Sequence, residues 1–119
     1  MATLEVKSFY TPDETRSLDH AVADFVTMGE HTVGRGVAQP GWKWSEHLKP
    51  LVGTESCQHS HLTYIISGRM RAIMDDGTEA IAGPGEIAVI PPGHDAEVVG
   101  DEPCEFIDFV GLGGFRSAG

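Results

Sequence analysis

Hydrophobic and polar positions along the chain follow a strand pattern rather than a helical one. Residues 63–66 and 104–110 are rich in β-branched and aromatic side chains, which favours strands. Met70, Ala72 and Met74 alternate with polar or differently facing neighbours, as in a strand with one face on the core. Because the strands are short and helical periodicity is almost absent, the pattern predicts an all-β, antiparallel sandwich or barrel.

Turn residues separate these runs. Asp76-Gly77 is a strong two-residue hairpin signal, and Gly29-Glu30 is expected to join a strand ending near Met28 to a second strand over residues 32–37. Pro91-Pro92-Gly93 ends the short buried strand predicted over residues 87–90. The turns therefore predict hairpins between neighbouring strands.

The remaining segments carry weaker patterns. Leu4 to Lys7 alternates and predicts a short edge strand, and Thr11 to Glu14 predicts a brief helical turn with proline at its first position. Trp42 and Trp44 lie two residues apart, which predicts that both indoles share one face of a strand. Lys49 to Gly53 is expected to be a connecting loop.

Length and charge narrow the class of protein. The 119 residues suit one domain, with a barrel core over about 22–110 and a loose glycine-rich tail over 111–119. Lys and Arg total 8 and Asp and Glu total 18, and the net charge of −10 argues against nucleic acid or membrane partners. No signal peptide or membrane span is recognisable, so we expect a cytoplasmic protein in which Cys57 and Cys104 stay reduced.

Several motifs together resemble a known family. Gly85-x5-Pro91-x-Gly93, preceded by the Asp76-Gly77 hairpin and by Tyr64-Ile-Ile-Ser-Gly68, is similar to the second half of a cupin barrel. The segments Trp42-Lys-Trp44 and Ile90-Pro-Pro-Gly-His-Asp-Ala96 are similar to a group of small single-domain cupins whose function is largely unassigned. The resemblance covers residues 40 to 110 and implies an antiparallel double-stranded β-helix, the cupin or jelly-roll barrel, and a homodimer. Apolar residues on the presumed outer face, such as Tyr64 and Ile66, agree with a dimer.

The resemblance also implies where metal ligands would lie. Cupins carry His-x-His, a Glu a few residues later, and a His three residues after the glycine of Pro-x-Gly. Here His61 takes the glutamate position and Ala96 takes that of the last histidine. The His-x-His positions fall on one of two alternatives, Glu55 with Cys57 or Thr54 with Ser56.

Strand alternation offers a substitute set of ligands. If the side chain of His61 points into the barrel, those of Cys57 and His59 do as well, and His94 has the same parity as position 96. Cys57, His59, His61 and His94 are therefore the candidate metal ligands. Such nitrogen and sulfur donors suit zinc, and iron, nickel and copper accept them too. Asp95 is a candidate to hydrogen-bond one of these histidines without contacting the metal itself.

Each of these residues also has a simpler interpretation. His94 alternatively hydrogen-bonds a neighbouring turn, and Cys57 alternatively packs as a small buried hydrophobe with no base partner recognisable in the sequence. One set of side chains either lines a pocket for a small molecule or packs in the core: Trp42, Trp44, Met70 and Met74. The other histidines are expected to be solvated in loops or at strand ends: His20, His31 and His47.

The sequence leaves the function open between different classes. One hypothesis is a metal-dependent enzyme that acts on a small organic substrate in the barrel lumen. The alternatives are a non-catalytic module that binds or senses a small molecule, and a barrel without a site that serves in protein interaction. No paired carboxylates, phosphate loop or serine triad points to other chemistry.

Overall fold

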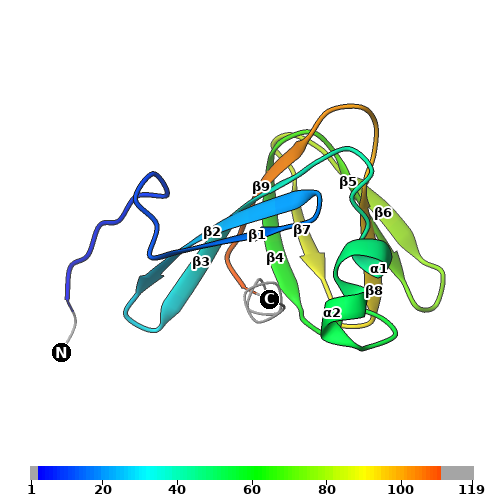
Figure 1. The fold of residues 1–119 in the computed structure, drawn as a ribbon, viewed down its shortest axis with the longest axis horizontal. Coiled ribbons are helices and arrows are strands. Elements are labelled where there is room, and N and C mark those ends of the chain that lie inside the picture. The colour runs from blue at the N-terminus through cyan, green and yellow to red at the C-terminus, as the bar shows by residue number, and fades with distance from the viewer. Residues whose placement is uncertain (1–2, 111–119) are drawn as a thin grey trace.

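Two antiparallel β-sheets form the molecule, and one sheet covers part of the other (Figure 1). The computed structural model describes residues 3–110. The larger sheet has the strand order β1 (Glu14–Leu18), β2 (Ala21–Met28), β3 (His31–Ala38), β9 (Cys104–Asp108), β4 (His61–Ser67) and β7 (Ile87–Ile90). The smaller sheet has the order β6 (Glu79–Ala82), β5 (Met70–Met74) and β8 (His94–Val98). This arrangement confirms the predicted all-β jelly-roll barrel.

The hairpin of β2 and β3 projects away from the smaller sheet, so the molecule is elongated (Figure 1), with extents of 44 × 28 × 24 Å. Only two short helices occur in residues 3–110, α1 (Trp44–His47) and α2 (Lys49–Val52), and both lie at the end of the barrel near β8. No helix within this part of the chain is both long and apolar enough to cross a membrane.

The strands and turns with a clear local pattern lie where the sequence predicts them. Gly29-Glu30 joins β2 to β3, and Asp76-Gly77 joins β5 to β6, with Gly77 at φ +91° and its N–H donated to the carbonyl of Met74 at 2.9 Å. Gly68, in the bend after β4, is also required: its φ is +75°, and a Cβ there would lie 2.2 Å from the carbonyl oxygen of Pro103. Local turn chemistry is therefore enough to predict these hairpins.

The N-terminal predictions are wrong. Leu4 to Lys7 forms no strand, and Glu14 begins strand β1 instead of ending a helical turn. Asp13 explains the difference, because its N–H donates to the carbonyl of Phe25 at 2.8 Å and its carboxylate accepts the N–H of Thr27 at 2.7 Å. These bonds to the neighbouring strand β2 replace the weak first turn of an isolated helix.

The prediction of a strand through Trp42 and Trp44 is also wrong, because Trp44 begins α1. The carboxylate of Asp95 in β8 accepts the N–H of Ser45 at 3.0 Å, which satisfies a free donor in the first turn of that helix. The predicted loop after Lys49 is α2, with a proline in its first turn and a left-handed Gly53 at its end.

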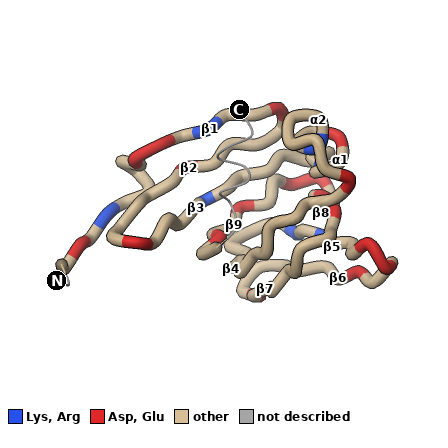
Figure 2. The backbone as a smooth tube through the Cα atoms, turned by 90° about the horizontal axis from the view of Figure 1, so that it is seen from below, with Lys and Arg blue, Asp and Glu red and all other residues tan. Residues whose placement is uncertain are grey.

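The buried side chains gather between the two sheets and beneath α1. Phe25, Ile65 and Cys104 are almost completely buried, and Trp42 and Trp44 belong to the same cluster. Acidic residues lie on turns such as β2–β3 and β5–β6, and Lys and Arg are fewer (Figure 2). The predicted loose tail, 111–119, lies outside the described residues.

Candidate functional site

A cavity of about 610 Å³ opens between the two sheets, and its walls are mostly apolar. The four side chains predicted to line a ligand pocket all contribute to it: Trp42, Trp44, Met70 and Met74. The two indoles are buried in the core cluster as well, so packing and pocket lining are compatible roles for them. The cavity is large enough for a small organic molecule.

Trp42 also leaves a polar atom unsatisfied in this wall. Its indole N–H is buried and has no hydrogen-bond partner among residues 3–110. An unpaired buried donor costs about 1–3 kcal/mol. A ligand acceptor that reached this N–H would remove that cost.

Three side chains with metal-binding atoms converge in the cavity: Cys57, His61 and His94. One ligand atom from each lies within 4.8 Å of the other two. Cys57 Sγ lies 3.7 Å from His61 Nε2, and the two imidazole rings meet edge to face with centroids 5.0 Å apart. Three of the four predicted ligands are therefore brought together.

Backbone hydrogen bonds to the turn before β8 hold Cys57 beside His94. Cys57 donates its N–H to the carbonyl of His94 at 2.8 Å and accepts the N–H of Gly93 at 2.7 Å. Gly93 ends the Pro91-Pro92-Gly93 turn at φ +91°, a conformation that favours glycine. His61 and His94 are the first residues of β4 and β8, so all three side chains come from one end of the barrel.

Hydrogen bonds orient both histidines in the same way. His94 donates its Nδ1–H to the carbonyl of Pro91 at 2.7 Å, and His61 donates its Nδ1–H to the carboxylate of Asp108 at 2.6 Å. A carbonyl and a carboxylate only accept, so these bonds fix the proton on Nδ1 in the neutral imidazoles. Each Nε2 is then left with a free lone pair for a metal.

Asp108 belongs to the candidate site but is not predicted from the sequence. Its side chain is 1% exposed, and besides His61 it accepts the backbone N–H groups of Leu62 and Val110. A buried carboxylate behind a metal-binding histidine raises the basicity of the ring and fixes its direction. An acid in the final strand on the same face as Cys104 and Phe106 was the available signal.

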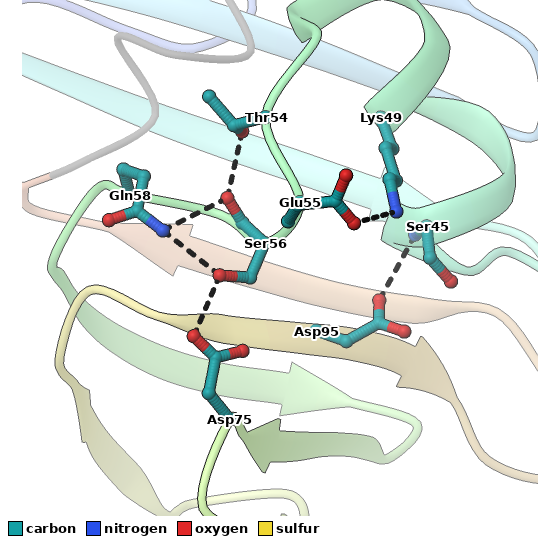
Figure 3. A network of polar contacts seen from close by, with 8 residues as sticks. All are labelled: Ser45, Lys49, Thr54, Glu55, Ser56, Gln58, Asp75 and Asp95. Carbon is teal, nitrogen blue, oxygen red and sulfur yellow. Dashed lines mark hydrogen bonds and ion pairs between the residues drawn. The ribbon is translucent and has the colours of Figure 1, made fainter.

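A network of polar side chains holds the segment that carries Cys57 (Figure 3). Thr54 donates its hydroxyl to the carbonyl of Ser56 at 2.8 Å, and Gln58 donates to the Ser56 hydroxyl oxygen at 2.9 Å. Ser56 in turn donates this hydroxyl to Asp75 at 3.0 Å, in the β5–β6 turn. Ser56, on one side of Cys57, is thus bonded to the β5–β6 turn, and Gln58, on the other side, is bonded to Ser56.

His59 and Asp95 do not take the places expected of them. His59 is exposed and lines the cavity but is not part of the converging group, because β4 begins only at His61 and strand alternation does not extend back to position 59. Asp95 Oδ1 accepts the N–H groups of Ser45 and Ala96, so its oxygen orients α1 instead of a histidine.

The electrostatics couple Cys57 to His61. Burial by itself raises the pKa of the Cys57 thiol, but hydrogen bonds with His61 and His94 outweigh it and lower the pKa from 9.0 to about 6. Burial opposes the charge on His61, yet the hydrogen bonds to Asp108 and Cys57 raise its pKa from 6.5 to about 9. At neutral pH the metal-free site therefore holds a thiolate beside an imidazolium.

The donor set fits a tetrahedral transition-metal ion. With the usual zinc bond lengths, sulfur and nitrogen ligands of one ion lie about 3.6 Å apart, close to the 3.7 Å between Cys57 and His61. One thiolate and two imidazoles leave a fourth position open for a substrate or water, as in catalytic zinc sites. Because the imidazolium must lose its proton to bind, metal uptake releases a proton.

Comparison with solved structures shows what this fold resembles. It is similar to the polyketide cyclase RemF from Streptomyces resistomycificus, with 15% identity and a TM-score of 0.65 over 92% of this chain and 80% of that chain. It is also similar to a Rhizobium leguminosarum protein of unknown function (20% identity, TM-score 0.60, 91% of this chain and 98% of that chain). The Clostridium difficile EutQ protein is similar as well (18% identity, TM-score 0.54, 76% and 67%).

At these identities the structural similarity establishes the fold alone. No curated protein sequence matches this chain. The profile of the cupin domain matches residues 49–110, just over half of the chain and the part that holds Cys57, His61 and His94. The chain therefore belongs to the cupin family.

Proposed function

We propose that this cupin binds a divalent transition metal in its lumen and uses it to act on a small organic molecule. The observation that carries the proposal is the convergence of Cys57, His61 and His94, with both imidazoles anchored through Nδ1. Zinc suits one thiolate and two imidazoles best, and iron, nickel or copper would accept the same donors.

A bound divalent ion supplies a Lewis acid that polarises an oxygen of the substrate. The chain itself provides orientation and a dry environment. Asp108 holds the His61 ring in place, and the indoles of Trp42 and Trp44 form an apolar wall against which a substrate can stack.

Cobalt titration of untagged protein tests the proposal directly. Thiolate coordination to cobalt gives an intense charge-transfer absorption band in the near ultraviolet, so the band reports an ion bound by Cys57. We expect the band to appear at one equivalent and to be lost in C57S, with H61A and H94A weakening cobalt binding about tenfold or more. H31A is the control, because His31 is an exposed histidine that does not line the cavity. A wild-type protein without this band would overturn the proposal.

The cavity favours a second function, in which the lumen binds a small molecule without turning it over. Its apolar walls and volume of about 610 Å³ would supply affinity independently of an ion. In that case, a compound that raises the Tm of the wild type would raise the Tm of H61A/H94A equally. A ligand-induced shift that disappears in this double variant would favour the metal-dependent function.

A further inference from the structure

A second group of metal-binding side chains lies outside the lumen and is formed by Asp19, His20 and His47. One ligand atom from each lies within 4.8 Å of the other two. Asp19 Oδ1 lies 2.8 Å from His20 Nδ1, and Asp19 Oδ2 lies 3.8 Å from His47 Nε2. The two imidazole rings are tilted by 35° with centroids 4.5 Å apart.

The fold holds His20 in this group at an energetic cost. Asp19 and His20 form the turn between β1 and β2, and His20 has φ +65°, the one positive value for a non-glycine residue in residues 3–110. That conformation costs an ordinary side chain about 1–2 kcal/mol. The carbonyl of His20 accepts the N–H of Gln39 at 2.7 Å, which fixes the turn with the imidazole beside His47.

His47 is the last residue of α1, and its ring is held by the backbone of Lys43. Its Nδ1 lies 3.0 Å from the backbone nitrogen of Lys43, whose N–H it can accept, and 3.1 Å from the carbonyl oxygen of Lys43, to which an Nδ1–H can donate instead. The second tautomer puts the lone pair on Nε2, the atom that faces Asp19, and is the one that an ion at Nε2 would select. The side chain of His47 is 11% exposed, whereas those of His20 and Asp19 are 42% and 75% exposed, so water can complete a coordination sphere.

Hydrogen bonding alone does not account for the arrangement. It explains the contact of Asp19 with His20, but the 3.8 Å between Asp19 Oδ2 and His47 Nε2 exceeds a hydrogen bond. Two donors about 2 Å from one tetrahedral ion lie about 3.3 Å apart. The separations of 2.8 Å and 3.8 Å lie about 0.5 Å on either side of this value.

We propose that Asp19, His20 and His47 form a second divalent-metal site that takes a borderline transition-metal ion such as zinc. One carboxylate, two imidazoles and water are its ligands. The ion would connect the β1–β2 turn to α1. Ala21 and Trp44, which follow the turn and begin the helix, both line the cavity, so the second ion would stiffen a wall of the lumen from outside.

Counting zinc equivalents in matched variants tests this site. The measurement is competition with a chromophoric chelator near pH 7.5, where ordinary imidazoles are largely neutral. We expect the wild type to bind one more equivalent than H20G, and H47A to behave like H20G. Glycine suits the positive φ at position 20, so H20G removes the imidazole without adding strain. H31A is the control, because His31 is exposed and lies outside both groups.

The cobalt charge-transfer band keeps the two sites apart. H20G should lose one zinc equivalent and the part of the zinc-dependent rise in Tm that this ion causes, while it keeps the thiolate band. C57S should lose the thiolate band and keep the zinc equivalent at Asp19, His20 and His47. If H20G and H31A bind the same number of equivalents with affinities within a factor of about ten, the second site is overturned whatever the lumen does.

Discussion

Replacing Asp108 with Asn tests whether this buried carboxylate fixes the proton of His61. The asparagine Oδ1 can still accept the N–H groups of Leu62 and Val110, which Asp108 Oδ1 accepts at 3.3 and 3.0 Å. The amide nitrogen then takes the place of Oδ2, at 2.6 Å from His61 Nδ1. An amide NH₂ only donates, so His61 must give up its Nδ1 proton and keep a proton on Nε2, the atom that faces Cys57.

This substitution should weaken metal binding and the stability of the metal-free protein by similar amounts. Loss of a partner behind a histidine ligand reduces metal affinity about 10–100-fold, which is about 1–3 kcal/mol. The metal-free protein loses a charge-assisted hydrogen bond between groups that are 14% and 1% exposed, worth about 1.5–3 kcal/mol. A His61 pKa raised from 6.5 to about 9 is worth about 3 kcal/mol, shared between Asp108 and Cys57, and agrees with that range.

Chelator competition measures the metal affinity, and urea unfolding of metal-free protein measures the stability. D95N is the matched control, because Asp95 uses only Oδ1 for its bonds to Ser45 and Ala96, and asparagine keeps that oxygen. If D108N binds metal as tightly as D95N and the wild type, Asp108 does not set the tautomer of His61.

Two further predictions concern the thiols and the outer face of the larger sheet. In metal-free protein, iodoacetamide should label Cys57 at a rate that rises with pH around a midpoint of about 6, because the thiolate is the reactive form. Cys104 has a pKa of about 11 and no exposed surface, so it should stay unlabelled at neutral pH. Peptide mass spectrometry would show this, and H61Q should move the midpoint upward; equal labelling of both thiols would contradict it. The expected homodimer stays a prediction: Ile87 and Val89 are 67% and 75% exposed, so V89E should change monomer stability by less than about 0.5 kcal/mol yet dissociate the dimer in analytical ultracentrifugation. A monomeric wild type would exclude that interface.

Elements that depend on local pattern could be predicted from the sequence, and those that depend on distant partners could not. The β2–β3 and β5–β6 hairpins follow from alternation and from turns such as Asp76-Gly77. Strand β1 and helix α1 depend instead on bonds of Asp13 to β2 and of Asp95 to Ser45, which join segments that only the folded chain brings together. Those partners are not visible in a local window of sequence.

The candidate site shows the same division. Parity along a strand and the family resemblance named Cys57, His61 and His94, but parity also included His59, because the sequence does not show that β4 begins at His61. Asp108 is 47 residues from His61 and pairs with it only through the order β9 next to β4. Strand order in a sheet of this kind is set by packing of the whole barrel, so the supporting carboxylate required the structure.

The contact between Cys57 and His61 also determines how folding exchanges protons with solvent. His61 has a raised pKa when folded, so its contribution to stability is complete below pH 6.5 and is lost as the pH rises toward about 9. Cys57 has a lowered pKa, so its contribution is complete above pH 9 and is lost as the pH falls toward about 6. Between about pH 6.5 and 9, folding adds a proton to His61 and removes one from Cys57, so the pair exchanges no net proton with solvent. The free energy of unfolding of the metal-free wild type should therefore change little with pH across that interval. C57S keeps the His61 bond to Asp108, so its free energy of unfolding should fall by up to about 1.4 kcal/mol per pH unit above pH 6.5.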